Sequence, residues 1–172
     1  KVKYVWFDTG LEYQATKNHL LYLNDKYNIN IESYKAKKPI PVTCNTSGQP
    51  FLSKYVSNMI YRLQFNGFKW EDKSFKDLCE EYPTCKGALT WWCNARDTTG
   101  FRNSMFNIDY HYGLKEFLIS NPPQFNISDK CCRYAKKDVA HKSIRYYKAD
   151  LSIVGIRKAE GGIRAASYKS CF

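Results

Sequence analysis

The chain has 172 residues, of which 44% are hydrophobic and 16% aromatic, and this composition excludes a disordered chain. Its apolar runs are far shorter than the roughly 18 residues that a membrane span requires, so we expect one globular domain over residues 1–172 with no membrane partner. The 27 Lys and Arg residues outnumber the 16 Asp and Glu residues, and the net charge of +11 favours polyanions such as nucleotides and nucleic acids as partners.

The first part of the chain alternates between strand and helix patterns. The apolar run over residues 2–7 predicts a buried strand of a parallel sheet, and Asp8-Thr9-Gly10 predicts the tight turn that ends it. Apolar residues at helical spacing predict an amphipathic helix over residues 12–27, and the alternation over residues 29–31 predicts a second strand. Strand, helix and strand in this order are typical of an α/β fold.

Proline, asparagine and glycine are frequent over residues 35–48 and predict a loop that leaves the second strand, where ligands bind in open α/β sheets. Four further helices are predicted, over residues 50–63, 74–82 and 110–119 and from Ser128 or Asp129 onward. The end of the chain predicts a strand over residues 151–154, a glycine-containing turn over 155–162 and a short helix over 163–168.

The seven cysteines, two of them adjacent at Cys131 and Cys132, argue against a complete set of disulfides. A reducing compartment fits better, and the N-terminal residues lack the pattern of an export leader, so we expect a cytoplasmic protein. In such a protein cysteines serve as metal ligands, as reactive thiols or as small core residues.

A carboxylate, a hydroxyl and a glycine stand together at the end of the first predicted strand, in Asp8, Thr9 and Gly10. At the carboxyl end of a buried strand, such a turn suits contact with ribose or adenine, because glycine lets the backbone approach a ligand closely. Asp and Gly are also the ordinary residues of turns, so the turn by itself leaves both interpretations open.

Two arginines and a glutamate follow the predicted C-terminal strand, in the segment GIRKAEGGIR. The guanidinium groups of Arg157 and Arg164 can form bidentate hydrogen bonds with phosphate or sulfate oxygens, and Glu160 could orient one of them. A surface cluster of salt bridges is the alternative interpretation.

Cys131 and Cys132 lie in the first turn of a predicted helix that is rich in lysine and arginine. We expect the helix N-terminus and these cations to lower the pKa of the thiols, and thiolates bind soft metals or attack sulfur. An iron–sulfur cluster normally takes four cysteines. Three are offered by Cys131, Cys132 and Cys171, and the candidates for the fourth are Cys44, Cys79, Cys85, Cys93 and a residue beyond Phe172. Zinc fits less well, because the chain has no C-x-x-C pair.

Three segments resemble, in order, the phosphoadenosine phosphosulfate (PAPS) reductase family of PP-loop enzymes. VWFDTGLEYQAT at residues 5–16 resembles its DTGLE-type strand and turn, and GQPFLSK at 48–54 resembles its glycine-proline-aromatic stretch. IVGIRKAEGGIRA at 153–165 resembles its GxRxxE…R segment. SDKCCRYAKK at 128–137 is similar to the CC-containing helix of iron–sulfur members of the superfamily.

The resemblance implies a Rossmann-like fold of the adenine nucleotide alpha-hydrolase type, a parallel sheet flanked by helices. It implies that Asp8, Thr9 and Gly10 lie by the adenosine of a nucleotide and that Lys54, Arg157 and Arg164 face its phosphate or sulfate groups, with Glu160 positioning an arginine. It also implies a [4Fe–4S] cluster at Cys131, Cys132 and Cys171. The SGGxDS loop and its strand, and the family's cysteine-bearing C-terminal tail, are not found in this sequence. We therefore interpret residues 1–172 either as a domain truncated at both ends, part of a longer protein, or as a divergent relative, and we expect the chain alone to bind nucleotide poorly and to be inactive.

For the intact protein the resemblance implies reduction of PAPS or adenylyl sulfate by a cysteine thiolate whose position is unknown. A thioredoxin-like electron donor and a second copy of the chain are the partners that this implies. A second enzymatic hypothesis is ATP-dependent sulfur transfer to DNA or tRNA, by an enzyme that releases pyrophosphate from ATP. A third, non-enzymatic hypothesis is a nucleic-acid-binding module that uses the basic and aromatic residues for phosphate contact and stacking.

Overall fold

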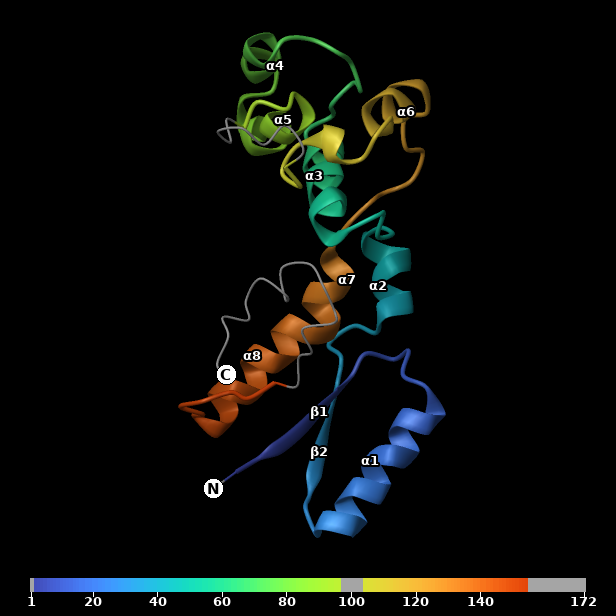
Figure 1. The fold of residues 1–172 in the computed structure, drawn as a ribbon, viewed down its shortest axis with the longest axis vertical. Coiled ribbons are helices and arrows are strands. Elements are labelled where there is room, and N and C mark those ends of the chain that lie inside the picture. The colour runs from blue at the N-terminus through green and yellow to red at the C-terminus, as the bar shows by residue number, and fades with distance from the viewer. Residues whose placement is uncertain (1, 97–103, 155–172) are drawn as a thin grey trace. The chain divides into compact units, whose positions relative to one another are not determined.

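A computed structural model describes residues 2–96 and 104–154 and shows a mixed α/β chain (Figure 1). The chain divides after Val139 into two compact units. The candidate site residues Arg157, Glu160, Arg164 and Cys171 lie outside the described residues, as do the turn and helix predicted after residue 154. Among the described helices, none combines the length and the apolar character needed to cross a membrane.

The N-terminal part of the first unit is a strand–helix–strand unit, as the sequence predicts (Figure 1). Strand β1 (Tyr4–Asp8) pairs in parallel with β2 (Ile31–Lys35), with Tyr4 opposite Ile31 and Asp8 opposite Lys35. Helix α1 (Gln14–Tyr27) connects them and ends at Asn28, whose left-handed backbone has φ 47°. The parallel register brings the carboxyl ends of both strands to the same edge.

The prediction that the first strand is buried was wrong within the described part of the chain. Tyr4 is 45% exposed and Val5 is 36% exposed. A continuous apolar run is typical of strands covered on both faces, but the sheet of the described residues has only two strands. The apolar sequence therefore identified the strand correctly but not its surroundings.

Residues 35–48 were predicted as a loop, and this prediction was also wrong. β2 continues to Lys35, and helix α2 (Ile40–Ser47) follows after a short connection. Pro39 is the N-terminal cap of α2 and Pro41 lies in its first turn, where the missing amide hydrogen of proline costs no helical hydrogen bond. Prolines at these positions start a helix, whereas the sequence pattern predicts a loop.

Helix α3 (Lys54–Phe65) supplies one wall of the hydrophobic core. Its apolar residues are the predicted ones, and Met59, Ile60 and Leu63 are all buried. The backbone amide of Val56 donates to the Ser53 hydroxyl at 3.1 Å, which satisfies one of the free amides at the helix start. The helix thus begins at Lys54, a candidate site residue.

Because Ser53 is the N-terminal cap of α3, we expect Ser53→Ala to lower the free energy of unfolding by about 1 kcal/mol. Urea denaturation followed by circular dichroism measures this change. Ser53→Asp is the matched control, since aspartate also caps helices and should preserve most of the stability. Equal losses in both variants would contradict a capping role.

The core of the first unit is rich in aromatic residues packed between short helices. These are α4 (Phe75–Glu81), the 3₁₀ turn η1 (Pro83–Cys85), α5 (Lys86–Trp92), the 3₁₀ turn η2 (Ile108–Tyr110) and α6 (Leu114–Ser120). The prediction of a helix over 74–82 is confirmed, and α5 was not predicted. Trp91 and Trp92 have no exposed surface, and the ring of Phe68 meets the ring of Trp92 edge-on at 5.3 Å.

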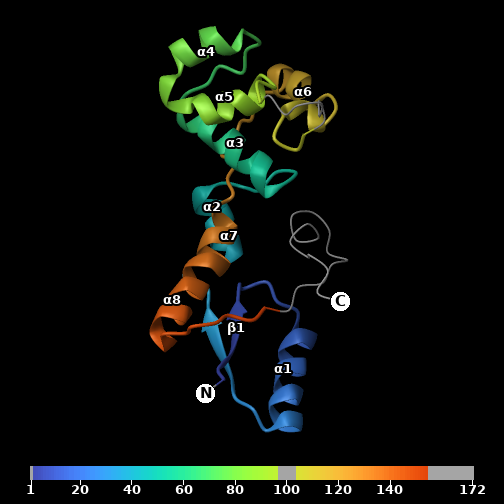
Figure 2. The ribbon, with the colours of Figure 1, turned by 60° about the vertical axis from the view of Figure 1, so that its left-hand side comes forward.

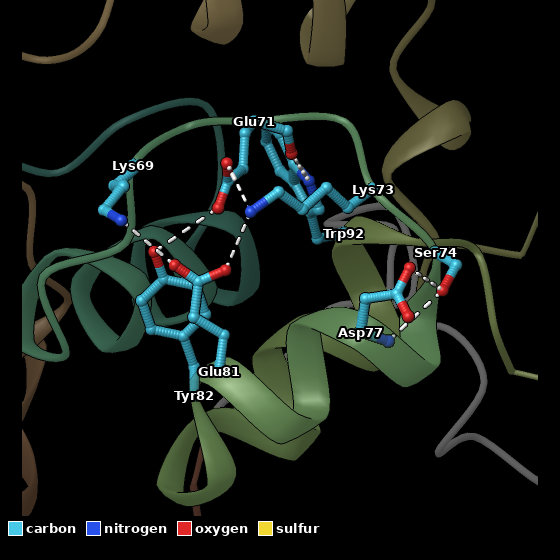
Figure 3. Close-up of polar contacts among 8 residues, drawn as sticks. All are labelled: Lys69, Glu71, Lys73, Ser74, Asp77, Glu81, Tyr82 and Trp92. Carbon is cyan, nitrogen blue, oxygen red and sulfur yellow. Dashed lines mark hydrogen bonds and ion pairs between the residues drawn. The ribbon is translucent and has the colours of Figure 1, made fainter.

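A loop that precedes α4 is tied to the end of that helix by ion pairs (Figure 3). Lys69 and Lys73 lie 3.1 Å and 2.8 Å from the two carboxylate oxygens of Glu81, and Lys73 also pairs with Glu71 at 2.9 Å. Hydrogen bonds from Lys73 and Lys69 lower the pKa of Glu81 to about 2. These groups are exposed, so the pairs position the loop and add little stability.

Two predicted elements near the C-terminal end differ in the structure. The helix predicted over 110–119 starts later, at Leu114, because Gly113 has a left-handed backbone with φ 70° and separates it from η2. Residues 151–154 form no strand, although their apolar sequence predicted one, and Ile153 is 88% exposed. An apolar run forms a strand only where a partner strand is available, and no described strand pairs with this one.

Candidate functional site

A short backbone pairing joins the two parts of the first unit that contain the candidate site residues. The amide of Gln49 donates to the carbonyl of Asn126 at 2.8 Å, and the amide of Ser128 donates to the carbonyl of Gln49 at 2.9 Å. The side chain of Gln64 adds two bonds, accepting from the Ile127 amide at 2.9 Å and donating to the Phe125 carbonyl at 2.8 Å. Residues 125–128 are thereby held between Gln49, which precedes α3, and Gln64 in the last turn of α3.

The two adjacent cysteines begin a helix that follows this pairing directly. Helix α7 (Lys130–Cys132) continues as the π-helical segment η3 (Arg133–Lys137) and then as α8 (Asp138–Tyr147). Ser128 and Asp129 both hold its start: the Lys130 amide donates to the Ser128 hydroxyl at 3.0 Å, and Asp129 accepts from Asn58 at 3.1 Å. A π-helical turn inside an α-helix is frequently found at functional sites. α7 and α2 pack side by side (Figure 2).

Lys54 and Cys132 are brought together by this arrangement. The Nζ atom of Lys54, in the first turn of α3, lies 3.9 Å from Sγ of Cys132. Lys130 also contacts α3, because its Nζ atom donates to the Tyr61 hydroxyl at 2.8 Å. The family resemblance implies that Lys54 faces a phosphate or sulfate group, and the structure shows it beside a thiol.

Cys131 differs from the expectation for the cysteine pair. Burial raises the pKa of its thiol, and the neighbouring Cys44 on α2 raises it further. The prediction of a lowered pKa was therefore wrong for Cys131. Its helix starts at the contact with α2, where loss of water outweighs the favourable field of the helix N-terminus.

The remaining described cysteines fall into two groups. Cys44 lies near Cys131, whereas Cys79, Cys85 and Cys93 lie in or against the aromatic core, where burial raises the pKa of both Cys85 and Cys93. All six described cysteines are free thiols. Of the four candidates within the chain for a fourth cluster ligand, Cys44 is the one near the adjacent pair. Within residues 2–96 and 104–154, no group of three ligand side chains is arranged to hold a metal ion.

The turn after β1 is organised around a glutamate that the sequence had not singled out. Oε2 of Glu12 accepts hydrogen bonds from three successive backbone amides, those of Thr9 at 2.9 Å, Gly10 at 3.1 Å and Leu11 at 3.2 Å. Its other oxygen accepts from the Thr9 hydroxyl at 2.6 Å. Thr9 is buried, with 3% of its surface exposed, and Asp8 accepts a further bond from the Gly10 amide at 2.9 Å. We call residues Asp8–Leu11 the Asp8 turn.

The Asp8 turn is also fixed against the start of α2. The Ile40 amide donates to the Thr9 carbonyl at 3.0 Å. Gly10 has φ 86°, and a Cβ atom at this position would lie 2.9 Å from Cβ of Pro39, so both the backbone shape and the close approach require glycine. α2 also packs against α7 and η3, and η3 contacts β1.

Positive charge is concentrated where these elements meet. Lys35 stands opposite Asp8 in the sheet, Lys38 lies 5.4 Å from the ring of Tyr134 in η3, and Lys54 lies by Cys132. Lysines at the carboxyl end of parallel strands, beside a carboxylate and thiols, can bind an anion and act on it chemically. Thr9 and Gly10 contact the start of α2, Cys131 lies on α7, which packs against α2, and Lys54 contacts Cys132.

Comparison with protein-family models, with curated proteins and with solved structures found no match to this chain. Sequence reasoning missed Glu12 and Gln49 within the site. The signal for Glu12 was present, since a carboxylate two residues after an Asp-Thr-Gly turn can reach back to its amides. Gln49 acts through its backbone, so its side chain carried no signal.

Proposed function

We propose that the intact protein is a cytoplasmic enzyme that binds an adenine sulfonucleotide at the carboxyl end of β1. In this proposal β1 and β2 belong to a Rossmann-like sheet of the adenine nucleotide alpha-hydrolase type, as the resemblance to the PAPS reductase family implies. The observation that supports it most is the meeting at α2 of the Asp8 turn and the helix with the adjacent cysteines. A nucleotide-type turn, a lysine and thiols are the groups that transfer of a sulfonate requires.

The proposed reaction is reduction of PAPS or adenylyl sulfate. A cysteine thiolate attacks the sulfonate sulfur, a sulfur–sulfur bond forms, and the bond from sulfur to the phosphate oxygen breaks, so that the nucleotide leaves with the electron pair. A dithiol donor of the thioredoxin type then supplies two electrons, sulfite is released, and the donor is left as a disulfide. Cationic groups such as Lys54 and, by the resemblance, Arg157 and Arg164 would stabilise the anionic group in transfer.

A [4Fe–4S] cluster is the second part of the proposal. Cys131, Cys132 and Cys171 would supply three of the thiolates that such clusters bind, and the position of Cys44 near Cys131 suits it as the fourth. When bound, the cluster would supply an electron-transfer centre. The absorption spectrum of the anaerobically purified protein tests this part independently of nucleotide binding.

The test of the proposed function is calorimetric titration of the full-length protein with PAPS, adenylyl sulfate and ATP. We expect a sulfonucleotide to bind and Lys54→Met to weaken its binding at least about tenfold, because a hydrogen bond to a charged group contributes roughly 1.5–3 kcal/mol. Lys76→Met, which removes a charge on the exposed side of α4, should change the affinity by less than about twofold.

Each other outcome selects a different function. Binding of ATP alone would favour ATP-dependent sulfur transfer to DNA or tRNA. If no nucleotide binds and polynucleotide affinity falls steeply and linearly with the logarithm of salt concentration, the protein is a nucleic-acid-binding module, for which its net charge of +11 is suited. Equal weakening by Lys54→Met and Lys76→Met would remove Lys54 from the site.

A further inference from the structure

Glu12 forms several hydrogen bonds with the Asp8 turn. Its two carboxylate oxygens accept four hydrogen bonds, from three backbone amides and one hydroxyl, all within residues 9–11. Hydrogen bonds to a carboxylate are stronger than those between neutral groups, so this one side chain sets the directions of all three amides.

Glu12 does not serve as a capping residue of helix α1. Acidic residues near a helix start usually stabilise the free amides of its first turn. Here α1 begins at Gln14, its cap Tyr13 makes no side-chain capping bond, and the carboxylate of Glu12 is directed back to the turn. Burial raises the pKa of Glu12, but the hydrogen bonds that it accepts from the Thr9 hydroxyl and the backbone, together with its interaction with the neighbouring Asp8 carboxyl, lower the pKa overall.

The two sides of the Asp8 turn are therefore fixed by different elements. Glu12 holds the amides, and the start of α2 holds the carbonyl of Thr9 through the Ile40 amide. The Thr9 hydroxyl is committed to Glu12 and its side chain is buried, whereas the side chain of Asp8 is half-buried and stays partly accessible at this end of the strand. One oxygen of Asp8 is oriented by the Gly10 amide, and that amide is shared with Glu12.

We infer that Glu12 is the positioning residue of the nucleotide site: its carboxylate sets the shape of the Asp8 turn before ligand binds, so that Asp8 is presented to the adenosine. This inference rests on the proposed function for the identity of the ligand. In this inference Thr9 acts through its hydrogen bonds with Glu12 and does not contact the ligand. Because the turn is already ordered in the folded protein, binding does not include the free-energy cost of ordering it, and the affinity for the ligand is higher.

The test compares Glu12→Ala, Glu12→Gln and Glu80→Ala in the full-length protein, the last being a matched loss of an exposed glutamate on α4. Amide hydrogen exchange, measured without nucleotide, should rise at Thr9, Gly10 and Leu11 in Glu12→Ala and stay unchanged in Glu80→Ala. Glu12→Gln retains an oxygen acceptor of the same shape and should retain most of the protection.

Nucleotide affinity is the second measurement. We expect Glu12→Ala to weaken binding about tenfold, Glu12→Gln to weaken it less, and added acetate to restore affinity in Glu12→Ala while leaving the wild type unchanged. Increased exchange with unchanged affinity, or affinity that acetate does not restore, would make Glu12 a purely structural residue and overturn the inference. Unchanged exchange would overturn it as well. If the wild type binds no nucleotide, the proposed function fails and so does the positioning role, while the exchange data still show whether Glu12 orders the turn.

Discussion

Trp92→Ala should lower the free energy of unfolding by about 3–5 kcal/mol, the loss typical of a large aromatic side chain removed from a core. Trp92 has no exposed surface and lies edge-on to both Phe68 and Trp70. Its indole nitrogen also donates to the carbonyl of Glu71 at 3.0 Å (Figure 3). The variant therefore leaves a cavity and also a carbonyl without its donor.

Urea denaturation followed by near-ultraviolet circular dichroism measures this loss, because the signal reports the packing of the aromatic core. Tyr112→Ala is the control, since the side chain of Tyr112 is fully exposed and its removal should change stability by less than about 0.5 kcal/mol. If the two variants unfold at the same urea concentration, Trp92 is not part of a packed core and the arrangement of α3, α4 and α5 is wrong.

Gly48→Ala should lower the free energy of unfolding by nearly as much as Trp92→Ala, because of the backbone conformation and contacts at Gly48. Gly48 has φ 107°, and a Cβ atom there would lie 2.5 Å from the carbonyl oxygen of Asn126. Alanine would have to relieve a backbone clash as well as a strained conformation, which alone costs roughly 1–3 kcal/mol. The movement would separate Gln49 from residues 126–128, so we also expect the contact of Lys54 with Cys132 to be lost.

Gly67→Ala provides a matched comparison for this variant. Gly67 has φ 66°, but a Cβ atom at that position meets nothing within 4 Å, so the control contains the conformational strain without the clash. We expect Gly48→Ala to unfold at clearly lower urea concentration than Gly67→Ala and to change the rate at which a thiol reagent labels Cys132. Equal stabilities and equal labelling rates would show that the pairing of Gln49 with residues 126–128 is not required.

Helices and strands could be predicted from the sequence where a single pattern, such as helical spacing of apolar residues, was clear. Helical spacing found both α1 and α3, although α1 has no buried residue, whereas the apolar stripe of α3 is buried. The segment with Pro39 and Pro41 was misassigned because proline has two meanings, a loop residue or a helix start, and only the following residues distinguish them. The strand predicted over residues 151–154 failed because strand formation depends on a partner that the local sequence does not contain.

The candidate site could be predicted residue by residue but not as an arrangement. The Asp8 turn and the adjacent cysteines were selected from residue type and position, and they are distant in sequence. Their meeting at α2 involves the backbone bond of Ile40 with Thr9 and those of Gln49 with Asn126 and Ser128, and backbone atoms give no signal in the sequence. Likewise, the raised pKa of Cys131 results from burial against α2, whereas the neighbouring sequence suggested the opposite sign.

The pairing of Gln49 with Ile127 has a consequence for how this chain tolerates changes in length. The pairing brings the chain back beside Gln49 after the long segment from α3 to α6, so this segment forms a closed loop. The entropy of closing such a loop rises slowly, by only about 0.6 kcal/mol for each doubling of its length. Insertions in those connections of the loop that lie outside its packed core should therefore leave Lys54 and Cys132 in contact.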